Sequence, residues 1–205
     1  MIRRPPRSTH CISSAASDVY KRQFIKKAIE LEALKFGDFT LKSGLKSKYF
    51  FNIASFFNGQ DMHFLASQYF KVIQKANLEF DAMYGPAYKG IPLATAISQL
   101  FYVEEQKKIE LIFDRKEIKD HGEGGKLIGD ISGKKILIID DVLTAGTAIK
   151  ETVEIIQQNN AKTVAAIVAL DRMEKDANSL TFKKNLEKSL SIPILSIATF
   201  EDLKE

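Results

Sequence analysis

The chain has 205 residues and a formal net charge of +4, which is enough sequence for one well-buried domain and too little for two comfortable ones. Five of the 30 basic side chains but only one of the 26 acidic ones lie in residues 1–23, so the rest of the chain carries 25 of each and is neutral. A neutral domain lacks the sustained basic face that a nucleic acid or an anionic membrane requires, so neither partner is expected.

The first 23 residues, MIRRPPRSTHCISSAASDVYKRQ, differ in composition from the rest. They contain the single cysteine and none of the eleven glycines or fourteen phenylalanines. They lack the apolar segment of a secretory signal, and although they are rich in Arg and Ser, as transit peptides are, SAASDVYKRQ is typical of translated adaptor sequence. We therefore expect residues 1–23 to be an extraneous leader outside the fold and residues 24–205 to form the domain. That domain is cysteine-free and has no apolar run of about 18 residues, which predicts a cytoplasmic protein.

Predicted helices and strands then alternate along the chain. Apolar residues recur at helical spacing from Phe24, and later helices follow the same pattern or begin with a proline in the first turn. Helices are predicted from Phe24 and over residues 63–76, from Gly90, over 148–158 and over about 180–190. Strands are predicted within residues 39–57 around a Ser-Gly turn, and over 80–84, 109–113, 135–139, 163–170 and 192–200.

The later strands are near-continuous apolar runs, which is typical of a parallel sheet with helices on both faces. In such a sheet, ligands bind outside the carboxyl ends of the strands. Four segments near strand ends carry unusual chemistry, and each has a functional and a purely structural interpretation.

The first segment is KKILIIDDVLTAGTAIK, in which Asp140 and Asp141 end an apolar strand. In the turn from Thr144 to Thr147, backbone N–H groups and hydroxyls lie before a helix, which favours a phosphate monoester. The turn lacks the lysine of a nucleoside triphosphate loop. Carboxylates beside it can bind sugar hydroxyls, so the pattern indicates a ribose 5-phosphate site. The alternative is that the aspartates only end a strand and cap a helix.

The second segment is GPAYKG, residues 85–90. Glycines and a proline predict a tight turn with exposed amides, and Lys89 adds a charge for a further phosphate. An ordinary surface turn is the alternative.

The third segment, FDRKEIKDHGEGGKLIGD, has four glycines and no apolar periodicity. Glycine hinges and clustered cations predict a lid that closes over a polyanion, whereas a solvated loop is the alternative. Its cations are Arg115, Lys116, Lys119 and His121.

The fourth constellation combines KSGLKSKYFFN with LDR. Phe50 and Phe51 beside Lys42 offer an apolar face next to a cation, and Arg172 can bind a carboxylate with two hydrogen bonds. A planar heterocycle with a carboxylate fits this set, although paired phenylalanines are usually core residues.

Together these segments resemble a known family. ILIIDDVLTAGTA resembles the phosphoribosyl pyrophosphate motif of the type I phosphoribosyltransferases, and TLKSGLKSKYFFN, GPAYKGIPLA and RKEIKDHGEGG resemble the signatures of the branch that uses orotate. The resemblance runs from about Gln23 to the end. It implies an α/β fold with a mainly parallel five-stranded sheet flanked by helices, and a small hood built from N- and C-terminal segments. The chain stops at FEDLKE, where the family continues with another helical stretch, so a truncated C-terminus is expected.

The resemblance also implies roles for individual residues. Catalytic roles fall on Lys89, Lys119, His121, Asp140 and Asp141. Binding of phosphoribosyl pyrophosphate falls on Lys42, Tyr88, Lys89, Arg115, Lys116, Lys119, His121, Asp140, Asp141, Val142, Leu143, Thr144, Ala145, Gly146, Thr147 and Ala148. Orotate contact falls on Lys42, Phe50, Phe51, Thr144 and Arg172. The cofactor is Mg²⁺, held mainly by substrate with the two aspartates nearby.

The implied protein is a homodimer in which the lid, residues 114–130, completes the partner's site. The implied reaction transfers the phosphoribosyl group of phosphoribosyl pyrophosphate to orotate, which gives orotidine 5′-phosphate and pyrophosphate in pyrimidine biosynthesis. A purine-type phosphoribosyltransferase and a regulator that binds phosphoribosyl pyrophosphate are the alternatives.

Overall fold

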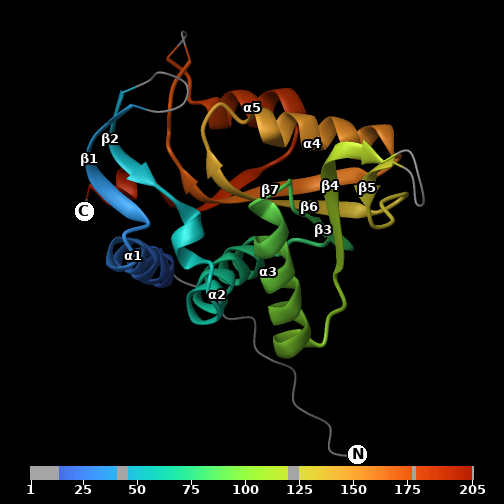
Figure 1. The fold of residues 1–205 in the computed structure, drawn as a ribbon, viewed down its shortest axis with the longest axis horizontal. Helices are drawn as coiled ribbons and strands as arrows, with labels where there is room; N and C mark the ends of the chain where they lie inside the picture. The colour runs from blue at the N-terminus through green and yellow to red at the C-terminus, as the bar shows by residue number, and fades with distance from the viewer. Residues whose placement is uncertain (1–13, 41–45, 120–124, 177–178, 205) are drawn as a thin grey trace, which may run out of the picture.

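A six-stranded sheet with the strand order β5-β4-β3-β6-β7-β8 forms the centre of the molecule (Figure 1). The computed structural model describes residues 14–40, 46–119, 125–176 and 179–204. The sheet strands are β3 (Ala82–Tyr84), β4 (Glu110–Lys119), β5 (Gly125–Ile128), β6 (Lys135–Leu143), β7 (Lys162–Asp171) and β8 (Ile194–Thr199). All neighbours are parallel except β5, which is antiparallel to β4 at the edge. The five-stranded parallel core is therefore confirmed, and the sixth strand comes from the predicted lid segment.

Helices cover both faces of this sheet. In Figure 1, α4 and α5 lie on one face and α2 and α3 on the other. These helices are α2 (Gly59–Ala76), α3 (Gly90–Glu105), α4 (Thr147–Gln158) and α5 (Phe182–Leu190). Among the described residues, no helix combines the length and the apolar content that crossing a membrane requires.

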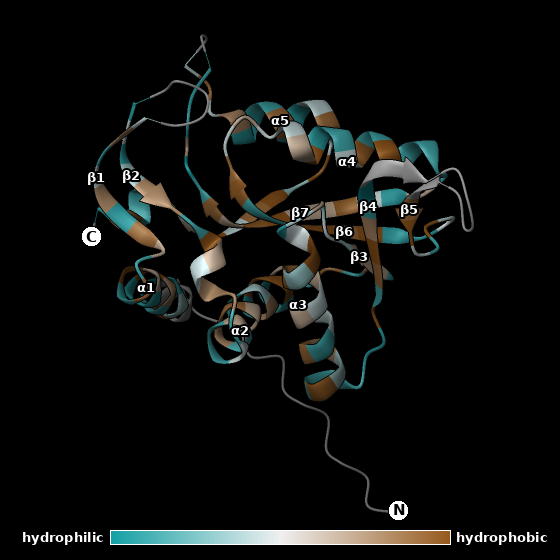
Figure 2. Ribbon diagram, viewed as in Figure 1, coloured by the Kyte–Doolittle hydropathy of each residue, from teal (hydrophilic) through white to brown (hydrophobic). Residues whose placement is uncertain are grey.

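Alternation along the strands divides the core in two. Leu137 and Ile139 of β6 belong to the cluster under α2 and α3, whereas Ile136 and Ile138 belong to the cluster under α4 and α5. Successive side chains of a strand point to opposite faces, so an unbroken apolar run is what a sheet covered on both sides requires. Figure 2 shows this hydrophobic centre along the strands, with hydrophilic residues on the outer helix surfaces.

A smaller hood stands beside the sheet and joins the two ends of the chain. It consists of α1 (Ser14–Glu30), the antiparallel strands β1 (Leu34–Thr40) and β2 (Lys46–Phe51), and the short helices η1 (Ile53–Phe56) and η2 (Glu201–Leu203). The rings of Tyr49 in β2 and Phe200 before η2 stack with centroids 5.3 Å apart. The expected hood of N- and C-terminal segments is therefore confirmed.

Helix α1 begins at Ser14, before the expected domain start at Phe24. Tyr20 is buried in the core, and the Lys21 ammonium lies 3.0 Å from the Asp202 carboxylate of η2. Residues 14–23 of the predicted leader therefore form the first part of helix α1 and belong to the hood. The origin of the leader in adaptor sequence stays a prediction, and residues 1–13 lie outside the described part.

Candidate active site at the carboxyl end of the sheet

Three neighbouring strands bring the predicted motifs together. Strand β6 lies between β3 and β7, and all three run in the same direction. The turn after β3, the loop after β6 and the residue after β7 therefore meet at one edge of the sheet. This edge is where a ligand site is expected in a parallel sheet.

The acidic pair lies inside β6, which continues to Leu143, rather than after the strand as the sequence indicated. The Asp140 carboxylate accepts a hydrogen bond from the N–H of Asp141 at 2.8 Å. The Asp141 carboxylate accepts one from the N–H of Val142 at 2.9 Å. From the helix α2 side, the fully buried Tyr69 donates its hydroxyl to the Asp140 carbonyl at 2.7 Å. These bonds fix the backbone under both carboxylates, so their positions are set before any ligand arrives.

The two carboxylates differ in their electrostatic surroundings. Burial raises the pKa of Asp140 to about 7, and the adjacent Asp141 charge adds to this effect. The Lys89 ammonium lies 2.7 Å from Oδ2 of Asp141, and its charge opposes the rise in the pKa of Asp140 to a smaller extent. A buried carboxylate beside another negative charge gains from a hydrogen-bond donor or a cation. The pair is therefore suited to a ligand that supplies hydroxyl donors.

The loop after β6 presents backbone N–H groups. Gly146, with φ of 74°, is the residue before α4, and no side chain caps this helix. The positive φ of Gly146 favours glycine, and a β-carbon there would also displace the Leu186 side chain of α5. Thr144, Ala145 and Thr147 are exposed around it. An uncapped helix start with exposed amides and hydroxyls is suited to a phosphate group.

The turn of residues 85–90 after β3 lies directly beside the acidic pair. A β-carbon at Gly85 would lie 2.3 Å from the Gly90 carbonyl oxygen, so the turn closes on itself too tightly for a larger residue. Lys89 ends the turn and reaches Asp141, while Tyr88 is exposed. The structure thus joins the predicted phosphate turn to the predicted sugar-binding carboxylates.

A cleft of about 260 Å³ lies between Arg172 and the hood. The Arg172 guanidinium stacks 4.4 Å above the ring of Tyr49. It donates to the Glu174 carboxylate at 2.6 Å and to the Ser47 hydroxyl at 2.9 Å. The guanidinium is therefore held against the Tyr49 ring in the wall of the cleft, with its charge balanced by Glu174.

The predicted aromatic pair divides between two faces. Phe50 is 42% exposed and contacts Phe39 with ring centroids 5.6 Å apart. Phe51 is buried, and its ring packs against Phe24 in the core. Adjacent residues of a strand point in opposite directions, so Phe50 alone of this pair offers an exposed ring.

The predicted lid is partly an antiparallel hairpin. The backbone of β4 carries Arg115, Lys116 and Lys119, and β5 pairs back onto it. The sequence indicated an irregular loop here because glycines and charges mask the strand pattern. The side chains of Lys116 and Lys119, together with all of His121 and Lys42, lie outside the described part of the structure.

Sequence reasoning did not identify several residues that shape this edge. Tyr69 lies in the helix predicted over residues 63–76, and nothing local in the sequence indicates that its hydroxyl reaches β6. Tyr49 and Glu174 lie within two residues of the predicted site residues Phe50 and Arg172 in the sequence. This proximity was the only sequence signal that they contact Arg172. Ser47 joins them only through the fold.

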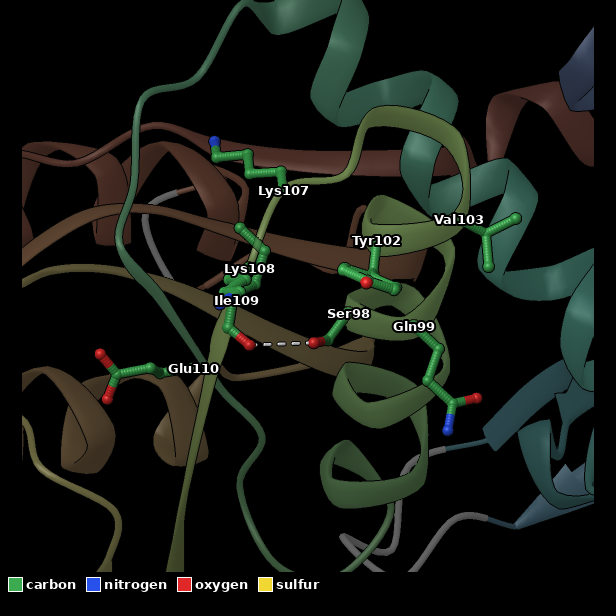
Figure 3. A pocket seen from close by; sticks show the side chains of 8 residues that line it. All are labelled: Ser98, Gln99, Tyr102, Val103, Lys107, Lys108, Ile109 and Glu110. Carbon is green, nitrogen blue, oxygen red and sulfur yellow. Dashed lines mark hydrogen bonds between the residues drawn. The ribbon is translucent and has the colours of Figure 1, made fainter.

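A larger hollow, of about 490 Å³, lies at the opposite end of the sheet, between the end of α3 and the start of β4 (Figure 3). Exposed Tyr102 and Val103 line it, and the Ser98 hydroxyl donates across it to the Ile109 carbonyl at 3.0 Å. It brings together none of the predicted site residues. Size alone therefore does not mark the candidate site.

Comparison with known proteins gives a consistent result. A sequence model of the phosphoribosyl transferase domain matches residues 58–198. The chain is 46% identical to the orotate phosphoribosyltransferase of Pasteurella multocida over 186 residues, which cover 91% of this chain and 87% of that protein. It is 44% identical to the orotate phosphoribosyltransferase of Shigella flexneri, with coverage of 90% and 86%. The solved orotate phosphoribosyltransferase of Francisella tularensis superposes with a TM-score of 0.78 at 39% identity, with coverage of 88% and 87%.

Proposed function

This chain belongs to the family of orotate phosphoribosyltransferases, and from that premise we propose which of its residues perform the transfer. It moves the phosphoribosyl group of phosphoribosyl pyrophosphate to orotate, in pyrimidine biosynthesis. The bond from the anomeric carbon to pyrophosphate breaks, and a bond from that carbon to an orotate ring nitrogen forms. The purine-using and regulatory alternatives lose support, because relatives of 44–46% identity are named for orotate.

The observation that carries the assignment of roles is the ion pair between Lys89 and Asp141, 2.7 Å long. It places a cation from the turn after β3 against a carboxylate from β6. We expect pyrophosphate to compete for Lys89, which frees Asp141 to accept hydrogen bonds from the ribose hydroxyls. Substrate binding would then replace the ion pair by contacts of Lys89 with pyrophosphate and of Asp141 with the ribose hydroxyls.

The 5′-phosphate is assigned to the loop of residues 144–148. The exposed Thr144 and Thr147 hydroxyls and the uncapped amides at the start of α4 supply donors. The positive end of the helix dipole adds to their attraction for a phosphate dianion. Leu143 is buried below the loop and anchors it to the core.

Orotate is assigned to the cleft between β2 and the end of β7. Arg172 would bind its carboxylate in this cleft. Phe50 does not line the cleft and is assigned to orotate from the resemblance. Lys42 and Thr144 are assigned to the same substrate from the resemblance. Buried Phe51 would contribute by fixing β2 through Phe24.

Catalysis in this arrangement is mainly electrostatic. The orotate nitrogen is anionic or nearly so, and therefore needs little help from a general base. Departure of pyrophosphate builds negative charge on the leaving group and positive charge on the ribose, next to Lys89 and to the acidic pair respectively. Charges held in place before the reaction lower its barrier because they need no reorganisation.

Mg²⁺ fits this donor set as an ion held mostly by the substrate. Among the described residues, no group of three or more His, Cys, Asp or Glu side chains could hold a metal ion by itself. Asp140 and Asp141 would face the ion with carboxylate oxygens, the ligands that Mg²⁺ prefers. When bound, the ion would neutralise pyrophosphate charge.

The lid is proposed to act across a homodimer, with Arg115, Lys119 and His121 entering the partner's site and Lys116 serving its own. Mixed dimers can test this. A dimer of one Lys119→Ala chain and one Asp141→Asn chain has one site with both defects and one with neither, if the lid acts in the partner. We expect co-refolded mixtures to recover activity that neither variant shows alone. A mixture of confirmed heterodimers without recovery would contradict the exchange of lids.

The direct test of the reaction is the loss of orotate absorbance after addition of phosphoribosyl pyrophosphate and Mg²⁺. Parallel reactions contain adenine, hypoxanthine or uracil instead of orotate. Of the four bases, we expect only orotate to be converted. Turnover with a purine base but not with orotate would overturn the assignment.

A further inference from the structure

Asp114 connects the lid strand to the turn of residues 85–90. It lies in β4, and its carboxylate accepts a hydrogen bond from the N–H of Ala87 at 3.0 Å. Two residues earlier in each segment, the N–H of Gly85 donates to the carbonyl of Ile112 at 2.9 Å. In a parallel ladder, every second residue of a strand donates to the same neighbouring strand. The Asp114 side chain therefore takes the place that a main-chain carbonyl would have in the next step of the ladder.

This substitution lets the turn leave the sheet without losing its hydrogen bond. The pairing of β3 with β4 ends at Tyr84 and Ile112. Beyond that point the N–H of Ala87 would lack a strand partner, and an unpaired amide costs free energy when it is shielded from water. A side-chain acceptor satisfies this N–H at a different distance from the strand axis, so the turn can leave the sheet and bring Lys89 to Asp141.

We propose that Asp114 is a positioning residue for the transfer reaction, because its side-chain oxygen holds the turn of residues 85–90 in the shape that binds pyrophosphate. The inference rests on the proposed role of that turn. It differs from the roles proposed for Lys89 and the lid cations, because Asp114 acts through the backbone of the turn.

The acceptor oxygen matters here, and the negative charge does not help. A carboxylate beside a pyrophosphate site repels the substrate, so its charge alone would weaken binding. The neighbouring Tyr84 is fully buried, and its hydroxyl interacts with the Asp114 carboxylate. Burial and then the Asp114 charge raise the pKa of Tyr84, so its hydroxyl stays protonated beside the carboxylate. An amide oxygen at this position would keep the bond to Ala87 and remove the repulsion.

The test compares three substitutions in the full chain. Asp114→Asn keeps the acceptor, Asp114→Ala removes it, and Asp114→Val removes it while favouring the strand. For Asp114→Ala and Asp114→Val we expect KM for phosphoribosyl pyrophosphate to rise about fivefold to tenfold, the size of one lost hydrogen bond. KM for orotate should change less than twofold. Asp114→Asn should stay within twofold of the parent for both substrates, or bind phosphoribosyl pyrophosphate more tightly.

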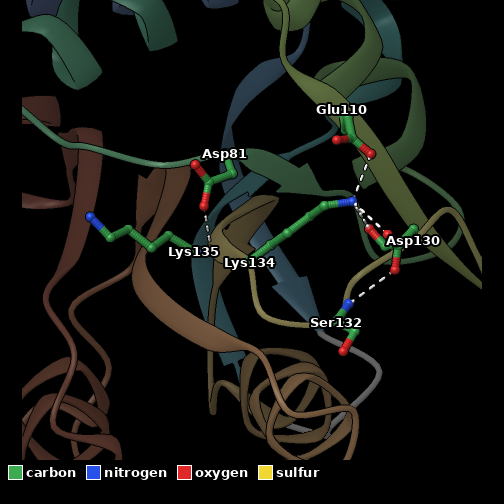
Figure 4. Close-up of polar contacts among 6 residues, drawn as sticks. All are labelled: Asp81, Glu110, Asp130, Ser132, Lys134 and Lys135. Carbon is green, nitrogen blue, oxygen red and sulfur yellow. Dashed lines mark hydrogen bonds and ion pairs between the residues drawn. The ribbon is translucent and has the colours of Figure 1, made fainter.

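Asp81→Ala is the matched control. The Asp81 carboxylate also accepts a hydrogen bond from a backbone amide, that of Lys135 at 2.8 Å, but at the other end of the sheet (Figure 4). It should change the melting temperature without changing either KM. If Asp114→Ala and Asp81→Ala lower stability alike and neither changes KM, the positioning role is wrong. Equal defects in Asp114→Asn and Asp114→Ala would also overturn it, because the retained acceptor would then have no effect.

Lys89→Ala separates this inference from the assignment on which it rests. Binding of Mg²⁺-pyrophosphate to each variant is measured by calorimetry. Weaker binding in Lys89→Ala with parent-like binding in Asp114→Ala supports the turn as the pyrophosphate site and overturns the role of Asp114. Parent-like binding in Lys89→Ala overturns both, whereas weaker binding in both alanine variants and parent-like binding in Asp114→Asn supports both.

Discussion

The two ends of the central sheet both carry charged side chains, but these are paired with each other at the amino end, whereas one carboxylate at the carboxyl end has a raised pKa. At the amino end, the Lys134 ammonium lies between the carboxylates of Glu110 at 2.8 Å and Asp130 at 3.1 Å (Figure 4). These contacts raise the pKa of Lys134 and lower that of Asp130. At the carboxyl end, burial raises the pKa of Asp140 to about 7. At the amino end the charges stabilise each other. At the carboxyl end the charge of Asp140 is unfavourable until a ligand binds.

This difference separates structural from functional charge. Solvent-exposed pairs at the amino end contribute little to stability and require nothing from outside the chain. A carboxylate with a strongly raised pKa in a cluster of donors is typical of a site at which ligand binding offsets the cost. The comparison therefore predicts that substitutions at the carboxyl end change activity, whereas substitutions at the amino end change only stability.

The largest effect is expected for Asp141→Asn. Loss of the carboxylate removes the partner of Lys89 and the proposed acceptor for ribose hydroxyls, so kcat/KM should fall about 100-fold. Steady-state kinetics measure this. Glu110→Gln makes the same chemical change at the amino end and should leave kcat/KM unchanged. An equal decrease of kcat/KM in Asp141→Asn and Glu110→Gln would contradict the assignment of function to the carboxyl end only.

A smaller effect is expected for Arg172→Lys. Lysine keeps the charge but cannot keep the planar contact with Tyr49 and the two hydrogen bonds to Glu174 and Ser47. KM for orotate should rise about tenfold, with little change in KM for phosphoribosyl pyrophosphate. A matched Lys134→Arg substitution at the amino end should change neither value. An increase confined to phosphoribosyl pyrophosphate would place Arg172 at the other substrate.

Asp140→Asn should make the fold more stable while it lowers activity. The pKa of Asp140 in the folded protein, about 7, is above its ordinary value of 3.8. The folded state therefore binds the proton more tightly, and the stability of the parent falls as pH rises from about 4 to 7. Asparagine removes this dependence and should stabilise the protein by about 1–2 kcal/mol above pH 7, with no gain below pH 4. Urea unfolding at pH 4, 6 and 8 measures it, and a gain that does not depend on pH would contradict the explanation.

The smallest effect is expected for Lys134→Ala. It leaves Glu110 and Asp130 without their cation, so the urea midpoint should fall slightly while kcat and both KM values stay at those of the parent. The decrease should shrink at high salt, because exposed ion pairs are screened. A change in kcat would show that the amino end communicates with the site.

The sequence by itself determined the architecture and the position of the chemistry. Unbroken apolar runs such as Ile136 to Ile139 are typical of strands covered on both faces, and their alternation with helices favours parallel strands. The acidic pair follows the apolar run of β6, and the turn of residues 85–90 follows β3, so their meeting at one edge could be inferred. Both are local signals that depend on spacing along the chain.

Tertiary structure alone decided which side chains face the ligand and which support them. Phe50 and Phe51 look equivalent in the sequence, but the pleat of β2 exposes one and buries the other. Tyr69 and Asp114 reach their backbone partners across gaps of 71 and 27 residues, and no local pattern records such contacts. Hydrogen-bond partners and burial depend on distances between elements, and packing sets those distances after local propensities have chosen the helices and strands.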